Sequence, residues 1–187
     1  MKVAVTDACI FIDLLDVDAC TAFFNLELEV VTSRQIWLEL EEEQRNILKK
    51  WIDKDRLSIK PGGQNVLKIR EEHKLSVSLS IADLTAWALA SDENGILLTS
   101  DGTLRKAAKA NNVKTHGLLW IFDQIVKNKL LTVDEASTKL EFIFDQNIIY
   151  KSDQKLYDAY EALVSRSLKI QLYAFLKHNA NAEPKEK

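Results

Sequence analysis

Residues 80–101, SIADLTAWALASDENGILLTSD, are the stretch that most constrains the fold of this chain. The segment begins with a good helix-capping residue, Ser80, continues as an apolar helix, breaks at 93–95 and ends in a short apolar strand. A helix that leads into such a strand is typical of a right-handed crossover between parallel strands. Asp83 and Asp101 stand at its two ends, and we expect the crossover to bring both acids to one edge of a sheet.

Strand-like and helical segments alternate through the first two thirds of the chain. Further strands are expected at 3–5, 28–31, 56–60 and 113–115, and further helices at 8–15, 34–52, 64–74, 103–111 and 118–129. This alternation predicts an α/β fold with a mainly parallel, twisted sheet. After residue 130 only helices are expected: one that opens with a capping box at 132–135 and a long one at 154–178.

The length and composition fit one domain with an appendage. A chain of 187 residues, 47% of them hydrophobic, can bury a substantial core. We therefore expect a domain over 1–129, a helical appendage over 130–178, packed on that domain or on a partner, and a disordered polar tail over 179–187.

Charge and cysteine content narrow the classes of function. The net charge of −3 and the pI of 5.7 argue against a broadly positive surface for nucleic acid. Lysine and arginine do concentrate within 49–74, which we interpret as a solvated helix face. Cys9 and Cys20 form no disulfide framework, and no apolar run approaches the roughly 20 residues of a membrane span. The chain is expected to be a cytoplasmic protein.

Acidic residues recur where a strand or loop leads into a helix. Asp7, Asp83 and Asp101 each read as a helix-capping acid when considered alone. In a parallel sheet, however, these passages open on the same edge, so we expect the three to lie near one another. Glu39 lies at the border of an apolar stripe on the helix expected at 34–52. Clustered carboxylates raise one another's pKa and suit a hard cation such as Mg²⁺ or Mn²⁺.

Four segments in this order, VAVTDACIFIDLL, SRQIWLELEEE, LSIADLTAWALA and ILLTSDGTLRKAAK, resemble the PIN domain and, within it, the VapC-like toxin nucleases. The resemblance covers about residues 1–129. It implies a three-layer α/β/α fold whose acids hold divalent metal and cleave RNA, with an antitoxin partner and a homodimer. By position, the implied metal-binding and catalytic residues are Asp7, Glu39, Asp83 and Asp101, with Thr99 in support.

The sequence departs from this family directly after the first aspartate. Family members usually carry Thr followed by Asn or Ser, whereas this chain has Ala8 and Cys9. Because a thiol hydrogen-bonds only weakly, we expect Asp7 to lack polar support, or the site to favour a different metal. The expected function is metal-assisted hydrolysis of RNA phosphodiester bonds. The alternative is a PIN-like protein-binding module with weak or no catalysis, which residues 8–9 and the low pI favour.

Other chemistries fit the sequence less well. A receiver domain would need a second acid beside Asp7, and the sequence has none there. His73, His116 and His178 belong to no recognisable nucleophile–base arrangement. We interpret these histidines as ordinary buried or surface residues.

Overall fold

The computed structural model describes residues 2–62, 66–147, 150, 158, 160–162 and 164–165. It divides the chain into two compact units, Met1–Leu130 and Leu131–Lys187, which are described separately below. The helix expected at 154–178 lies mostly, and the tail expected at 179–187 wholly, outside the described residues.

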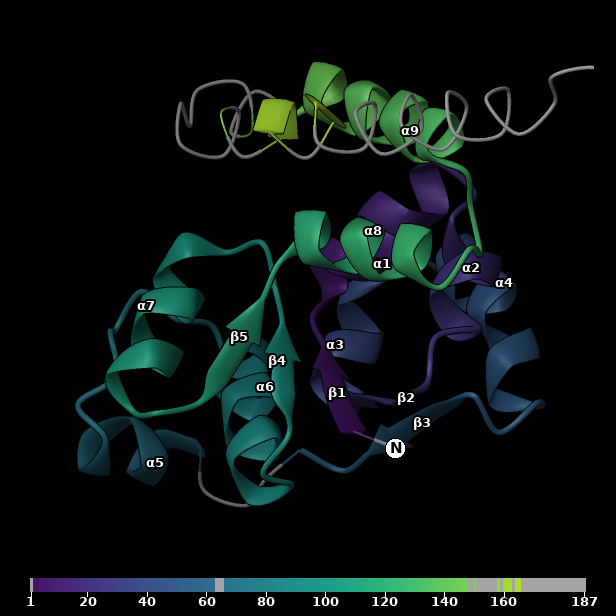
Figure 1. The fold of residues 1–187 in the computed structure, drawn as a ribbon. Coiled ribbons are helices and arrows are strands. Elements are labelled where there is room, and N and C mark those ends of the chain that lie inside the picture. Colours follow the sequence, from purple (N-terminus) through teal and green to yellow (C-terminus); the bar gives the residue numbers. More distant parts are fainter. Residues whose placement is uncertain are drawn as a thin grey trace, which may run out of the picture. The chain divides into compact units, whose positions relative to one another are not determined.

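The first unit is built around five strands that all run in the same direction. These are β1 (Lys2–Thr6), β2 (Leu28–Ser33), β3 (Leu57–Lys60), β4 (Ile96–Leu98) and β5 (Lys114–His116). Their order in the sheet is β3-β2-β1-β4-β5, and every neighbouring pair is parallel (Figure 1). In the centre, Val5 of β1 pairs with Val31 of β2 and Leu97 of β4, and all three are fully buried. The predicted α/β fold with a parallel sheet is confirmed.

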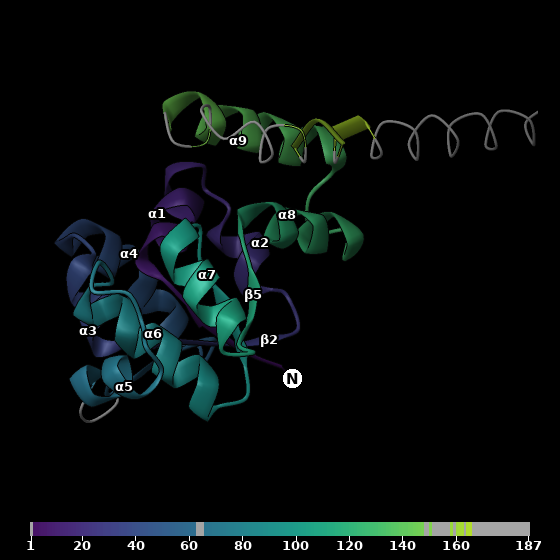
Figure 2. The ribbon, with the colours of Figure 1, turned by 90° about the vertical axis from the view of Figure 1, so that its left-hand side faces the viewer.

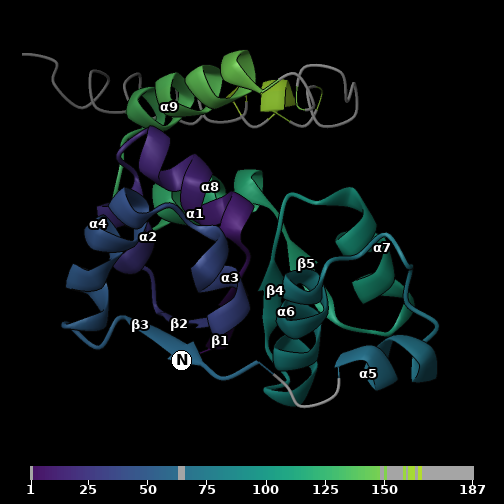
Figure 3. The same ribbon diagram turned by 180° about the vertical axis from the view of Figure 1, so that it is seen from behind.

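Helices cover both faces of this sheet. They are α1 (Ala8–Asp16), α2 (Cys20–Phe24), α3 (Arg34–Glu39), α4 (Glu42–Ile52), α5 (Val66–Glu72), α6 (Ile81–Asp92), α7 (Gly102–Ala110) and α8 (Leu118–Lys127). Figure 2 shows α3, α5, α6 and α7 on one side of the strands and α2 and α8 on the other. Seen from behind, α6 lies across β4 (Figure 3), and it also contacts β1 and β2. The result is the expected three-layer arrangement.

The turn from α6 into β4 brings two backbones close together. Asn94 has a φ of 46°, in the left-handed region that asparagine tolerates. A side chain at Gly95 would place its Cβ 2.9 Å from the carbonyl oxygen of Val3 in β1. Glycine therefore allows β4 to begin directly beside the central strand.

The prediction of a single helix at 34–52 is wrong, because the helix is interrupted at Leu40, between α3 and α4. Leu40 has an extended conformation with a ψ of 145°, and the side chain of Gln44 accepts a 2.8 Å hydrogen bond from the backbone N–H of Glu41. This local bond starts a second helix at Glu42. One consequence concerns Ile47, which the spacing of a continuous helix would place on the apolar stripe with Ile36 and Trp51: it is 42% exposed, whereas the other two are buried. Glu39 is the last residue of a short helix.

The second unit contains α9 (Val133–Gln146). The predicted capping box is present: Thr132 Oγ1 accepts from the Glu135 N–H at 3.2 Å, and the Glu135 carboxylate accepts from the Thr132 N–H at 2.7 Å. The apolar side of α9 stacks Phe144 on Tyr150 and Tyr160 at ring-centroid distances of 5.3 and 4.9 Å. Of the helices described in either unit, none combines the length and apolar character that crossing a membrane requires.

Candidate active site

Asp7 lies directly after β1 and caps the first helix. Its Oδ1 accepts a 2.7 Å hydrogen bond from the backbone N–H of Ala8. Its Oδ2 accepts from the hydroxyl of Thr99 at 2.7 Å and from the thiol of Cys9 at 3.2 Å. The side chain is 6% exposed. Three donors thus hold a nearly buried carboxylate at the carboxyl end of the central strand.

The expected lack of polar support beside Asp7 is wrong, because Cys9 provides it. Besides donating to Asp7, the Cys9 sulfur accepts a 3.3 Å hydrogen bond from the Ser100 N–H and lies 3.8 Å from Thr99 Oγ1. Burial, followed by the charge of Asp7, raises the pKa of the Cys9 thiol. The thiol therefore keeps its proton and remains a donor at neutral pH. The sequence shows that a weak donor stands at position 9, whereas its enclosure appears only in the structure.

A single buried hydroxyl connects the ends of β1 and β4. Thr99 Oγ1 donates to Asp7 Oδ2 and accepts a 3.0 Å hydrogen bond from the backbone N–H of Asp101. Asp101 in turn caps α7, because its Oδ1 accepts from the Leu104 N–H at 2.6 Å. The Asp101 side chain is exposed. Asp101 is thus joined to Asp7 through Thr99.

Asp83 and Glu39 come from two helices on the same side of the sheet. Asp83 forms a capping box with Ser80: its Oδ2 accepts from the Ser80 N–H at 2.7 Å, and its own N–H donates to Ser80 Oγ at 3.0 Å. Glu39 ends α3, which contacts α6. A buried 2.8 Å hydrogen bond between Ser33 Oγ and Thr85 Oγ1 ties the start of α3 to α6. This packing sets the position of Glu39 relative to Asp83.

Three of the four predicted acids act on one another electrostatically. Burial raises the pKa of Asp7, and the charge of Asp83 raises it further, while the hydrogen bonds from Thr99, Cys9 and Ala8 lower it. The pKa of Glu39 is raised by partial burial and then by the charges of Asp7 and Asp83. The charge of Asp83 thus acts on the Asp7 carboxyl group, and the charges of Asp7 and Asp83 act on that of Glu39.

The capping roles considered for Asp7, Asp83 and Asp101 are all confirmed, and they leave acceptor capacity for a cation. Each carboxylate has about four lone-pair sites, of which hydrogen bonds use three at Asp7 and one each at Asp83 and Asp101. The donor set consists of carboxylate oxygens, which suit Mg²⁺ or Mn²⁺. Within the part of the chain that the structure describes, however, no three Asp, Glu, His or Cys side chains converge as a metal-binding group. The donor set fits a hard divalent cation because its ligands are carboxylate oxygens. A cation would also offset the repulsion between the charges of Asp7, Glu39 and Asp83.

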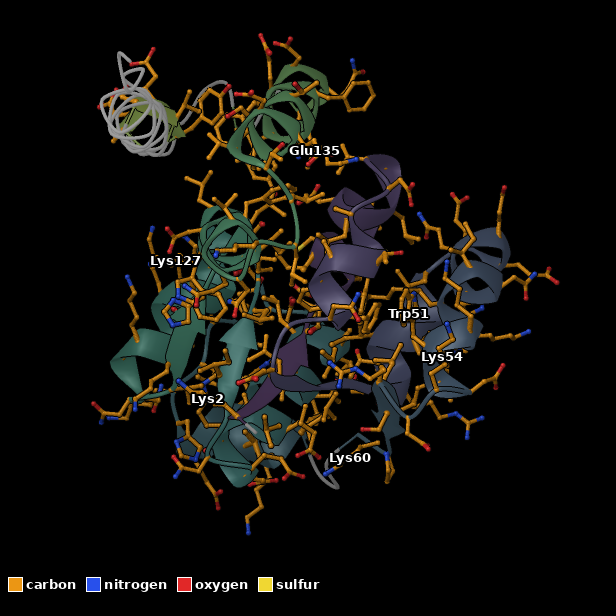
Figure 4. The ribbon with its side chains drawn as sticks, turned by 45° about the vertical axis from the view of Figure 1, so that its right-hand side comes forward. Lys2, Trp51, Lys54, Lys60, Lys127 and Glu135 are labelled. Carbon is orange, nitrogen blue, oxygen red and sulfur yellow. The ribbon has the colours of Figure 1, made fainter. Side chains whose placement is uncertain are left out.

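The basic residues at 49–74 are distributed over α4, β3, α5 and the adjoining turns, and several contact distant parts of the chain. Lys54 Nζ lies 5.2 Å from the centroid of the Trp51 ring (Figure 4), and Lys60 forms an ion pair with Glu93. The guanidinium of Arg70 donates to the Leu79 carbonyl at 2.6 Å. The interpretation as a solvated face holds for the five lysines that are exposed, and it is wrong for the three partly buried residues: exposed are Lys49, Lys50, Lys54, Lys68 and Lys74, and partly buried are Arg56, Lys60 and Arg70.

Arg105 is a residue of the site region that the sequence gave no reason to select. Its Nη2 donates to the carbonyl oxygen of Thr99 at 2.9 Å. The same nitrogen lies so close to Gly117 that a Cβ there would collide with it. The signal in the sequence was the glycine directly before an apolar helix, but the partner of that glycine is visible only in the tertiary structure.

The fold and these side chains define an α/β protein with acidic residues at the carboxyl edge of a parallel sheet. A model of the family described as PIN domain (DUF3368) matches residues 3–164, and the chain belongs to this family. The match runs from the first unit into the second.

Two solved structures are similar to the chain at low identity. One is described as a domain of a functionally unknown protein from Methanocaldococcus jannaschii; it is 22% identical, with a TM-score of 0.45, covering 63% of this chain and 91% of that one. The other is FitAcB from Neisseria gonorrhoeae, 18% identical, with a TM-score of 0.39, covering 60% of this chain and 95% of that one. No curated protein matches the chain in sequence.

Proposed function

We propose that this protein is a metal-dependent nuclease that hydrolyses phosphodiester bonds in RNA. The observation that carries the proposal is that Thr99 joins Asp7 and Asp101 at the carboxyl ends of two neighbouring strands, on the sheet whose contacting helices α3 and α6 carry Glu39 and Asp83. Like charges gathered at a nearly buried carboxylate are unfavourable unless a cation offsets them. Membership in the PIN family, whose members are generally nucleases, supports the same function.

Each residue would have a separate task in this reaction. Bound Mg²⁺ or Mn²⁺ would supply Lewis acidity, lowering the pKa of a water molecule and offsetting charge on the phosphate. Cys9 and Thr99 hold the Asp7 carboxylate in place, and Ser80 holds that of Asp83. Glu39 is exposed and its pKa is raised, so it is the carboxylate best suited to accept a proton from water.

Cleavage of single-stranded RNA in Mn²⁺ tests the proposal. Asp83→Asn and Asp101→Asn should each lower the cleavage rate by about 100-fold or more, because each removes a charged ligand of the cation. Asp92→Asn is the matched control, since Asp92 is an exposed acid at the opposite end of α6 from Asp83. If the first two variants cleave as fast as the wild type, the assignment is wrong.

The role as the toxin of a toxin–antitoxin pair, with an antitoxin partner and a homodimer, is a finer proposal that rests on the resemblance of the four motifs. Expression of the wild type in a bacterial host should arrest growth, whereas Asp83→Asn should not. Light scattering on the purified protein tests the dimer. A neighbouring gene for a small DNA-binding protein would identify the antitoxin. Growth arrest by both the wild type and Asp83→Asn would contradict a nuclease toxin.

One observation favours the alternative of a protein-binding module with little catalysis. Among the residues that the structure describes, the acids do not converge as a ready-made metal-binding group. Titration calorimetry with Mn²⁺ separates the two functions, because a module without a metal site has no reason to bind the ion. Binding that is lost in Asp83→Asn supports the nuclease, and no binding by the wild type supports the module.

A further inference from the structure

Arg105 lies on α7, one turn after Asp101, and its side chain is partly buried. Its guanidinium reaches back to Thr99, where Nη2 donates a 2.9 Å hydrogen bond to the carbonyl oxygen. Its Nε is buried and has no hydrogen-bond partner among the described residues, and no described carboxylate forms an ion pair with it. Burial of a cation with so few partners costs free energy. The contact with Thr99 is therefore the feature that needs an explanation.

The Thr99 carbonyl belongs to a peptide group that is held at both ends. In the same planar unit, the Ser100 N–H donates a 3.3 Å hydrogen bond to Cys9 Sγ. Arg105 and Cys9 together therefore fix the rotation of this peptide plane. Thr99 is fully buried, and its own N–H donates to the His116 carbonyl at 3.0 Å. A buried carbonyl that lost the guanidinium would have to turn to find another donor.

This peptide group stands between two acids of the candidate site. On one side of it, the Thr99 hydroxyl donates to Asp7 Oδ2 at 2.7 Å. On the other side, the Asp101 N–H donates to the same hydroxyl at 3.0 Å. A rotated peptide would change the direction in which the chain leaves Thr99, and with it the place of Asp101 relative to Asp7. A cation that takes ligands from both acids would then be held less tightly.

Gly117 gives independent evidence for the place of the guanidinium. Its φ of −115° is an ordinary extended value, so the backbone does not require glycine at this position. A Cβ there would lie 2.4 Å from Arg105 Nη2, whereas the nearest atom outside Arg105, the Thr99 carbonyl oxygen, would be 3.5 Å away. The guanidinium thus fills the space that the glycine leaves. A side chain at position 117 would push it off the Thr99 carbonyl.

We propose that Arg105, admitted by Gly117, is a positioning residue that sets the relative placement of Asp7 and Asp101 for a divalent cation. It acts through the peptide group between Thr99 and Ser100 and contacts neither the cation nor the RNA. The inference rests on the proposed function, because it assigns a further residue to the metal site of that nuclease. The charge of Arg105 alone predicts the opposite effect, since a nearby guanidinium repels a cation and its removal would tighten Mn²⁺ binding.

Calorimetry with Mn²⁺ on the full chain gives the first measurement. Arg105→Ala should weaken Mn²⁺ binding by about 10-fold. Gly117→Ala should weaken it to a similar extent although the positive charge is kept, because the new Cβ displaces the guanidinium. The double variant should bind no more weakly than Arg105→Ala, since both changes break the same hydrogen bond. Lys109→Ala is the matched control, because it removes an exposed positive charge from the same helix and should bind Mn²⁺ as the wild type does.

Amide hydrogen exchange in the metal-free protein gives the second measurement, and it separates positioning from a general loss of stability. The Asp101 N–H, which donates to the Thr99 hydroxyl, should exchange about 10-fold faster in Arg105→Ala and in Gly117→Ala. The N–H of Val5, in the central strand, should keep its wild-type exchange rate. A merely structural role of Arg105 would accelerate the exchange of both amides.

The inference is overturned if Arg105→Ala binds Mn²⁺ as tightly as the wild type or more tightly, or if the Asp101 N–H keeps its exchange rate. It is also overturned if the variant loses affinity for RNA in EDTA instead, because the guanidinium would then be a ligand of the substrate. A wild type that neither binds Mn²⁺ nor cuts RNA is a failure of the proposed nuclease. The exchange rates alone then decide whether Arg105 orders residues 99–101.

Discussion

At the scale of single residues, the Asp7 carboxyl group is harder to ionise than a free aspartate although three donors contact it. Burial and the charge of Asp83 outweigh the hydrogen bonds, so its pKa in the folded protein is raised from 3.8. Above pH 3.8 and up to the raised pKa, the folded protein therefore binds more protons than the unfolded chain does. The stability of the metal-free protein consequently decreases as the pH rises through this window.

Replacement of Asp7 by Asn should reveal this destabilisation. Asparagine also caps helices well and carries no charge, so in EDTA at pH 7 the variant should melt a few degrees above the wild type. The difference should shrink as the pH is lowered through the raised pKa of Asp7, because the wild-type carboxyl then takes up a proton. Thermal melts at a series of pH values measure both effects. Equal melting temperatures at pH 7 would contradict the prediction.

Cys9 should act by positioning Asp7. Cys9→Ala removes one donor to Asp7 Oδ2, and we expect Mn²⁺ affinity to fall by about 10- to 100-fold. Cys9→Ser keeps a donor at the same place and should stay within a few-fold of the wild type. Calorimetry provides the measurement, with Cys20→Ala as control, because Cys20 is a second buried thiol whose pKa burial raises to about 12. Equal losses in Cys9→Ala and Cys9→Ser would argue against the hydrogen bond.

At the scale of elements, three of the described helices, α4, α6 and α9, begin with a capping box, and only the box of α6 contains an acid of the site. Ser80→Ala should destabilise the protein by about 1 kcal/mol, as loss of a helix cap usually does. It should also reduce RNA cleavage, because the Ser80 hydroxyl no longer fixes the first turn that carries Asp83. Thr132→Ala removes the equivalent cap of α9 and should leave cleavage unchanged. Urea unfolding and cleavage assays measure the two effects separately.

Equal effects of these two variants on cleavage would mean that the Ser80 box contributes only to stability.

The break between α3 and α4 is a second feature at the scale of elements. Propensity and spacing favour one continuous helix through 34–52, and the local bond from Glu41 to Gln44 ends that continuity. The position of Glu39 therefore depends on how a short helix packs on α6, which periodicity does not reveal.

At the scale of the whole molecule, the sheet and eight of the described helices belong to the first unit. A chain ending at Leu130 should therefore unfold cooperatively and bind Mn²⁺ as the full chain does. Denaturant unfolding followed by circular dichroism and by tryptophan fluorescence gives the first measurement, and calorimetry the second. If the two optical transitions no longer coincide, residues beyond 130 are needed for the fold of the first unit.

The sequence by itself determined the order of the strands, because apolar runs are local features, whereas α2 and the break between α3 and α4 were not predicted. The sequence also predicted the acids at the starts of helices, since Asp7, Asp83 and Asp101 cap their own helices within a few residues. Contacts across long sequence separations were decided by the tertiary structure alone. Thr99, which follows β4, donates a hydrogen bond to Asp7, which follows the neighbouring strand β1, and Arg105 lies against Gly117. Such contacts arise from strand order and packing, and neither leaves a periodic signal in the chain.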